Sequence, residues 1–322
     1  MHLAVYLPLV IPVLAALAAR PLADRLPPAA ATWLLAGSSL ALAAASSAVL
    51  GLLALTALVR VPPVAAIANM SVQAISHSDT VSLPVAIAAG ALLAAAAAAA
   101  CRAVWRRGTA IVAAGRQASR LPGSGQVVVT EDDAADAYTL PGWPCRIVIT
   151  SGMLRVLSES ERKVLVAHER AHAGGSHYLF TSAARLAAAA NPLLRPVAAQ
   201  VGYTVERWAD ERAATAAGDR PLTARAIARA AMASTAAPPD RAGQATALGL
   251  VGGNDAERKE KASLRRAVPV PRRVAALLGP PPRTSMLLLA GAVLLVALSG
   301  ASALEAARNL HQLVELAQAA RS

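Results

Sequence analysis

Four long, apolar stretches without charged residues restrict the possible folds of this chain more than any other feature. They are residues 3–19, 31–59, 83–101 and 284–304. A helix needs about 20 such residues to cross a hydrocarbon core about 30 Å thick. The sequence therefore predicts a mainly α membrane protein with four transmembrane helices.

Basic residues flank these stretches unevenly. Arg20 and Arg25 follow the first stretch, Arg102 to Arg107 follow the third, and a basic segment at 258–273 precedes the fourth. The loop at 60–82 contains a single basic residue. Because basic loops stay on the cytoplasmic side, both termini are predicted to lie outside and the region before the fourth stretch inside. The Ala-, Leu-, Val- and Arg-rich composition suits Ala-rich helices and a GC-rich bacterial genome, so the membrane is predicted to be a bacterial cytoplasmic membrane.

The formal net charge of +12 would indicate nucleic-acid binding in a soluble protein. Here 56% of the residues are hydrophobic, and the basic residues gather beside apolar stretches. We interpret the segment at 258–273, including Arg272 and Arg273, as juxtamembrane and in contact with lipid headgroups. The lipid bilayer is thus a predicted partner, and no direct contact with nucleic acid is expected.

Three regions follow from this layout. Residues 1–105 hold three transmembrane helices, residues 106–283 are enough for one domain with its own core, and residues 284–322 hold the fourth helix and a short amphipathic tail. Within the middle region, short strands are predicted at 126–130, 136–140 and 146–150. The last of these either pairs with an extended substrate or is an internal strand.

Helices are predicted in the second part of this domain. Residues 158–175 read as one capped helix, because Ser158 and Glu161 form a capping box and Gly174-Gly175 is a stop signal. A helix pair broken at Asn191-Pro192 is predicted to follow, resting at the membrane interface without crossing it. A further helix is predicted at 222–233, and a loop at 237–255.

The capped helix carries the pattern H-E-x-x-H as His168, Glu169 and His172. Residues four apart lie on one face of a helix, so both imidazoles can reach a single Zn²⁺. Glu169 then lies where it can take a proton from a zinc-bound water. The pattern predicts zinc as the cofactor and Glu169 as the catalytic residue.

Glu206 is the candidate third zinc ligand, since two histidines and a glutamate leave the fourth position open for water. Asp210, one turn later, would accept the free ring N–H of a ligand histidine and orient it. The competing interpretation of these two acidic residues is a solvated charged face. His177, beyond the glycine pair, is open to three interpretations: an extra ligand, a residue that supports a ligand, or a surface histidine.

Two segments resemble the integral-membrane zinc metallopeptidases of family M56 and, more distantly, family M48. They are RIVITSGMLRVLSESERKVLVAHERAH, residues 146–172, and VERWADERAA, residues 205–214. The resemblance implies an α+β, zincin-like (gluzincin) peptidase domain on the cytoplasmic side. M56 members that sense β-lactams carry a penicillin-binding domain after the last span. Only about eighteen residues follow residue 304 here, so direct sensing of that kind is not expected.

Three functions agree with these observations. The first is a zinc endopeptidase that cleaves a protein substrate, such as a cytoplasmic transcriptional repressor, as the M56 resemblance implies. The second is an M48-like protease that removes damaged membrane proteins. The third is a non-catalytic membrane signalling scaffold in which the zinc site is structural or degenerate. A closed structural site would need His177 or Asp210 as a fourth ligand. The sequence carries no signal for the oligomeric state.

Overall fold

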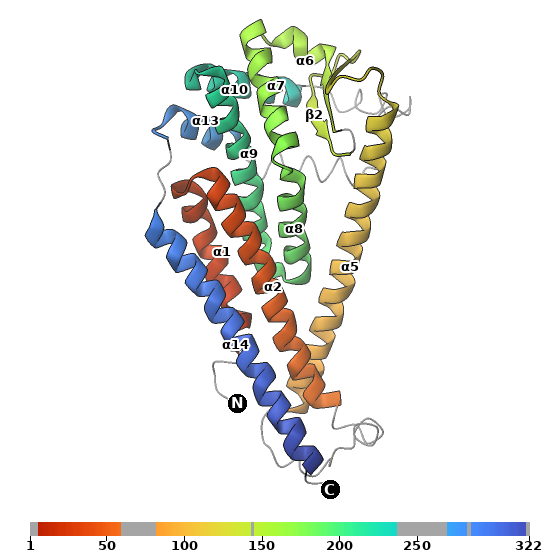
Figure 1. Cartoon of the computed structure of the whole chain (residues 1–322), viewed down its shortest axis with the longest axis vertical. Helices are drawn as coiled ribbons and strands as arrows, with labels where there is room; N and C mark the ends of the chain where they lie inside the picture. The colour runs from red at the N-terminus through yellow and green to blue at the C-terminus, as the bar shows by residue number, and fades with distance from the viewer. Residues whose placement is uncertain (1–5, 59–81, 143–144, 237–268, 282–284, 320–322) are drawn as a thin grey trace.

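The computed structural model describes residues 6–58, 82–142, 145–236, 269–281 and 285–319. These residues form long helices below a smaller domain that contains a three-stranded sheet (Figure 1). The predicted loop at 237–255, most of the basic segment at 258–273 and the loop at 60–81 lie outside the described residues.

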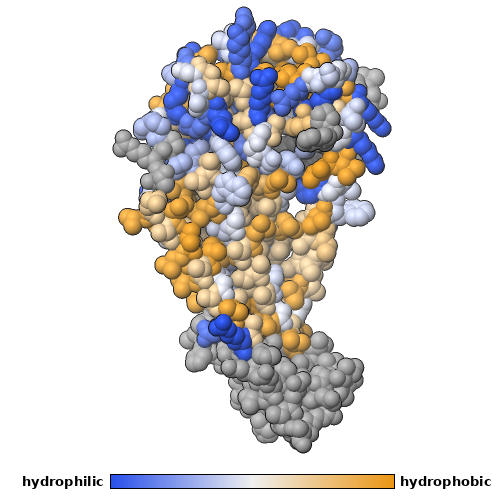
Figure 2. Space-filling view, in the orientation of Figure 1, coloured by the Kyte–Doolittle hydropathy of each residue, from blue (hydrophilic) through white to orange (hydrophobic). Residues whose placement is uncertain are grey.

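Four of the described helices are long and apolar enough to cross a membrane. They are α1 (Leu7–Arg25), α2 (Pro28–Leu58), α5 (Leu83–Arg120) and α14 (Met286–Ala319). Each contains all or most of one predicted stretch. Figure 2 shows their apolar surface below an end of the molecule where hydrophilic residues gather. The prediction of four helices of membrane-spanning length and composition is confirmed.

α5 continues well past the predicted end of its apolar stretch. It runs to Arg120 and so crosses the predicted boundary at residue 105 without a break. Ala and Arg are among the best helix formers, and they dominate the sequence up to Pro122. The upper end of α5 packs against the sheet, where Ala118 contacts Leu140 and Val148. The sheet is therefore attached directly to a membrane-type helix.

The sheet contains β1 (Val127–Thr130), β2 (Ala137–Leu140) and β3 (Arg146–Thr150), close to the predicted strands. β3 lies in the centre, parallel to β1 and antiparallel to β2. All five residues of β3 are buried. The suggestion that residues 146–150 pair with a substrate is therefore wrong, because both edges of this apolar strand are occupied. β2 lies at the edge of the sheet.

The remaining helices of the upper domain are α6 (Ser151–Val156), α7 (Glu159–Gly174), α10 (Arg220–Ala236) and α13 (Val270–Leu278). α7 contacts β2, β3, α10 and the long helix α9 (Arg195–Ala217), and α13 packs on α10 and α9. The capping box predicted at Ser158 and the helix predicted at 222–233 are both present.

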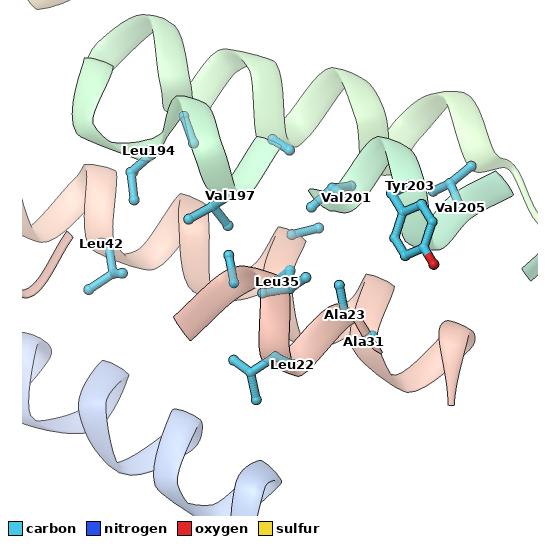
Figure 3. Packing of buried hydrophobic residues seen from close by; sticks show 14 of the residues in the cluster. Leu22, Ala23, Ala31, Leu35, Leu42, Leu194, Val197, Val201, Tyr203 and Val205 are labelled. Atoms are coloured by element: carbon cyan, nitrogen blue, oxygen red, sulfur yellow. The ribbon is translucent and has the colours of Figure 1, made fainter. Parts of the chain in front are cut away.

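A helical hairpin connects the upper domain to the apolar helices. It consists of α8 (His177–Ala190), a short 3₁₀ turn and α9 (Arg195–Ala217), with the predicted break at Asn191-Pro192. The core between the hairpin and α1 and α2 is made mostly of small and aliphatic side chains, together with the ring of Tyr203 (Figure 3). Small side chains let helix backbones approach closely. The lower half of the hairpin thus lies alongside α1 and α2.

Hydrogen bonds add specific connections within this apolar region. Thr32 on α2 donates to the hydroxyl of Thr204 on α9 at 2.9 Å. Asn191 donates to Ser46 Oγ at 3.1 Å, and Ser46 donates in turn to the carbonyl of Pro8 at 2.7 Å. Polar groups in apolar surroundings need such partners. These contacts fix the depth of the hairpin relative to α1 and α2.

Candidate metal centre

α7 brings His168, Glu169 and His172 to one buried region. Its first turn is fixed by the capping box, in which Glu161 accepts the Ser158 N–H at 2.9 Å. The four-residue spacing then places the Nε2 atoms of His168 and His172 3.1 Å apart. His168 and Glu169 are each 8% exposed. The two histidines therefore face a common point inside the domain.

Glu206 on α9 faces the same point. Its carboxylate oxygens lie 3.7 Å from His168 Nε2 and 3.6 Å from His172 Nε2. α7 and α9 can approach this closely because Val164 packs against Ala213, which is completely buried. The structure thus brings together the three residues that the sequence suggested as metal ligands, and they form a possible metal-binding triad.

The donor set fits zinc. Two imidazole nitrogens and one carboxylate oxygen are the ligands of many catalytic zinc sites, with bond lengths of about 2.0–2.2 Å. Tetrahedral geometry at those lengths separates ligand atoms by about 3.3–3.5 Å. The observed separations of 3.1, 3.6 and 3.7 Å bracket that range. The triad could accept zinc with small side-chain movements.

Asp210 lies one turn after Glu206, behind the ring of His168. Its Oδ1 is 3.0 Å from His168 Nδ1, on the opposite side of the ring from the triad. The side chain of Asp210 is 2% exposed. The carboxylate is therefore placed to hold the His168 ring, and its burial argues against the solvated charged face that was the alternative.

Arg273 on α13 is a central residue of the site that sequence reasoning misplaced. Its Nε and Nη2 donate to the two carboxylate oxygens of Asp210 at 2.8 and 2.6 Å, and its Nη1 lies 3.0 Å from Glu206 Oε2. The expectation of lipid-headgroup contact is wrong for this residue, because its guanidinium group pairs with the buried carboxylate of Asp210 and the half-buried carboxylate of Glu206. Two acidic residues one turn apart on a packed helix indicate in the sequence that a basic partner is required, but they do not show which arginine it is.

Arg272 also points into the protein. It donates to Asp24 Oδ1 at 2.6 and 2.9 Å and to Gln200 at 3.0 Å, and its guanidinium lies 3.7 Å from the centre of the Tyr203 ring. The headgroup prediction is wrong for this residue as well. Arg272 thus contacts the end of α1, and its neighbour Arg273 contacts the acidic residues of the candidate metal centre.

The charges around the triad explain how its protonation differs from that of free side chains. Burial raises the pKa of Glu206, but Arg273 and His172 outweigh it and hold the pKa well below its usual range. Burial lowers the pKa of His168, yet Asp210 and Glu206 raise it to about 10. Burial lowers the pKa of His172 to about 4. The ionised carboxylates therefore attract a cation, but a metal that binds Nε2 of His168 must displace the proton that they keep on this ring.

Thr139 on β2 connects the sheet to Glu169. Its hydroxyl lies 2.8 Å from Glu169 Oε2 and 3.1 Å from the Glu169 carbonyl oxygen, and it can donate to either. Burial raises the pKa of Glu169. The sequence predicted the strand but gave no reason to single out Thr139, because the pairing joins residues thirty positions apart. One edge of the sheet is thereby tied to the predicted catalytic carboxylate.

His177 is not a surface residue, since it is only 2% exposed. Its Nδ1 lies 3.0 Å from Nδ1 of His172, and its ring packs on Trp208 with a centroid separation of 4.7 Å. This contact is behind the His172 ring, away from the triad. His177 is therefore placed to support a ligand.

Comparison with known proteins places this site in a family. The sequence model of peptidase family M48 matches residues 104–280, which include the triad, Asp210 and Arg273. No curated protein and no solved structure matches the chain significantly. The match supports the more distant of the two resemblances, while that to M56 stays a prediction. Because the matched region covers more than half of the 322 residues, the chain belongs to peptidase family M48, a family of zinc metallopeptidases.

Proposed function

We propose that the chain is a membrane-embedded zinc endopeptidase. The convergence of His168, His172 and Glu206 on one point, with Glu169 adjacent, is the observation that carries this proposal. The four membrane-type helices support a location in the bilayer. Membership of family M48 supports the peptidase chemistry.

In the proposed reaction, His168 and His172 would hold the metal through their Nε2 atoms, and Glu206 would hold it through a carboxylate oxygen. Bound zinc would supply a water of lowered pKa and would polarise the peptide carbonyl. Glu169 accepts the proton of the attacking water and returns it to the leaving amine. Its raised pKa, a result of burial, suits it to hold that proton transiently.

The neighbouring residues keep this arrangement in place. Thr139 binds Glu169 Oε2, which leaves the other oxygen of Glu169 for the proton. Asp210 orients His168 from behind, and Arg273 holds Asp210 and Glu206 together. Residues at this distance from a metal commonly fix the orientation of its ligands.

The geometry argues against the scaffold function. A closed structural zinc site needs a fourth protein ligand. Asp210 and His177, the two candidates, lie against the Nδ1 atoms of His168 and His172. Both therefore contact the far side of a ligand ring and leave the fourth position at the Nε2 side open.

We propose four membrane spans, with both termini outside and the peptidase domain in the cytoplasm of a bacterium. The basic residues beside the spans, such as Arg20 and Arg106, support this orientation. An extended substrate segment would lie beside β2, since this edge strand carries Thr139 next to Glu169. Nucleic acid is not a proposed ligand.

Two substrate classes fit this proposal. Family M48 membership favours membrane-protein quality control, and the M56 resemblance favours cleavage of one cytoplasmic regulator. Quantitative proteomics of a strain that lacks the protein distinguishes them. Accumulation of many membrane proteins indicates quality control, whereas stabilisation of a single soluble regulator indicates dedicated signalling.

The Glu169→Gln variant tests the peptidase proposal. The detergent-purified variant should keep about one zinc per chain, since Glu169 is not a ligand, and should lose cleavage of casein and of itself by at least about 100-fold. The Glu206→Ala variant should lose both zinc and cleavage. Cleavage by Glu169→Gln at the native rate, or a wild-type protein without zinc, would refute the proposal.

A further inference from the structure

The turn between α7 and α8 is built to turn one histidine back toward the metal centre. Gly175 lies directly against His177, and a Cβ on Gly175 would overlap the His177 ring. Ser176 adopts a left-handed backbone conformation with φ of 48°, which is uncommon for a residue other than glycine. A residue without a side chain and a strained neighbour together direct the His177 ring back beneath the end of α7.

The ring of His177 is buried against two other rings. The ring lies between Trp208, at 4.7 Å between centroids, and His172, at 4.8 Å. Trp208 is on α9 between Glu206 and Asp210, so the same helix supplies a ligand, the support of His168 and the packing surface for His177. The Nδ1 atom of His177 then faces the Nδ1 atom of His172 at 3.0 Å.

Tautomer chemistry determines what this contact can be. If His172 binds a metal through Nε2, a neutral ring must carry its proton on Nδ1. The 3.0 Å separation then requires a lone pair on Nδ1 of His177, with the His177 proton on Nε2. Two Nδ1–H groups facing each other at this distance would repel. Only one pair of tautomers therefore leaves Nε2 of His172 free to bind a metal and also places a single proton between the two Nδ1 atoms.

We propose that His177 is a positioning residue that accepts the Nδ1–H of His172 and so presents the Nε2 lone pair of His172 to zinc. This inference rests on the proposed zinc-peptidase function. It gives each ligand histidine its own support: Asp210 holds His168 with a negative charge, and His177 holds His172 with a neutral ring. A neutral acceptor adds no further negative charge beside Glu206 and Asp210.

Two substitutions separate this role from simple packing. His177→Phe keeps an aromatic ring against Trp208 but cannot accept a hydrogen bond. His177→Asn loses the ring, but its Oδ1 takes the place of the imidazole Nδ1 and can accept the proton. Zinc affinity, measured by competition with a chelator, should fall about 10- to 100-fold in His177→Phe and recover at least partly in His177→Asn.

The visible absorption of the Co²⁺-substituted protein supplies a readout independent of cleavage. His177→Phe should shift this spectrum, because a free His172 ring changes the ligand geometry, and His177→Asn should return it toward that of the wild type. Thermal unfolding without metal shows whether each variant is folded. Gly175→Ala, which pushes the His177 ring away, should change zinc affinity in the same direction as His177→Phe.

The outcomes distinguish this inference from the proposed function. A His177→Phe or Gly175→Ala protein with the wild-type zinc affinity and Co²⁺ spectrum would overturn the role of His177 and leave the peptidase proposal intact. A higher zinc affinity in His177→Phe than in His177→Asn would also overturn it, since packing of an aromatic ring would then matter more than the hydrogen bond. A wild-type protein that binds neither zinc nor Co²⁺ would overturn the proposed function, and this inference with it.

Discussion

The first half of α9 packs against apolar helices, whereas its second half carries the ionic side chains of the candidate metal centre. Val197 and Val201 are at most 1% exposed and contact α1 and α2 through aliphatic side chains (Figure 3). Glu206, one turn beyond Tyr203, and Asp210, two turns beyond it, contact the guanidinium group of Arg273.

The comparison shows two ways to hold a single helix. In the apolar half, the fit of small side chains and a few hydroxyl groups fixes position. In the ionic half, each buried charge is stable only while its partner is present. The second half should therefore respond far more strongly to removal of one group, which the following substitutions test in order of expected effect.

The Arg273→Met substitution should have the largest effect on stability. It leaves the carboxylate of Asp210 buried without its guanidinium partner and removes the same partner from the half-buried Glu206. Removal of one member of a buried pair typically costs about 3–5 kcal/mol. Thermal or denaturant unfolding in detergent measures this loss. Arg155→Met is the matched control, because its ion pair with Asp133 is exposed and such pairs contribute about 0–1 kcal/mol. Equal effects of the two substitutions would contradict the comparison.

The sequence predicted the parts of both halves that depend on local pattern. Uncharged length identified the apolar helices, and the spacing of His168 and His172 placed two imidazoles on one face of a capped helix. Glu206 followed from the chemistry of zinc. The helices and the shared face of the two histidines could be predicted because helix periodicity is a property of neighbouring residues.

The sequence did not predict the contacts between distant segments. Arg273 meets Asp210 from a position 63 residues later, and Thr139 meets Glu169 from an edge strand. The order of the three strands also lay beyond local pattern, so the central strand was mistaken for one that could pair with a substrate. Such pairings depend on how elements pack, and one basic or hydroxyl residue in a sequence resembles another.

In the apolar half, Ala23→Leu should destabilise by overpacking. Ala23 on α1 is completely buried, in the same core as the aliphatic residues of α9. Added methylene groups in a well-packed core typically cost about 1–3 kcal/mol. Ala88→Leu on the exposed face of α5 is the control and should be nearly neutral in detergent. A tolerated Ala23→Leu would mean that close packing does not hold this half.

The free energy of unfolding should depend on pH through Glu161, at the start of α7 in the upper domain. Burial raises the pKa of Glu161, but hydrogen bonds from Ser158 and the charge of Arg229 lower it below its usual value. A lowered folded-state pKa means that Glu161 contributes stability above the unfolded value of about 4.3, which is lost as pH falls through the folded pKa.

The Glu161→Gln variant measures this contribution. Its stability should be about 1 kcal/mol below that of the wild type at pH 7, which is typical of a lost helix cap, and the difference should shrink as pH falls below about 4. Unfolding of both proteins at several pH values measures the stability difference at pH 7 and the pH at which this difference shrinks. A difference that is independent of pH would show that the carboxylate charge is not what stabilises this turn.

The smallest expected effect belongs to the hydroxyl pair in the apolar half. Thr32 donates to Thr204 at 2.9 Å, and valine has nearly the same shape as threonine without the hydroxyl group. A double-mutant cycle of Thr32→Val and Thr204→Val should give a coupling of about 0.6 kcal/mol, the average for such bonds between membrane helices. The coupling stays small because Thr32 can instead donate to the carbonyl of Pro28, at 2.8 Å, and Thr204 to that of Val201, at 3.2 Å. A coupling energy as large as the stability loss in Arg273→Met would contradict the comparison. Hydrogen bonds would then stabilise the apolar half of α9 as strongly as ion pairs stabilise the ionic half.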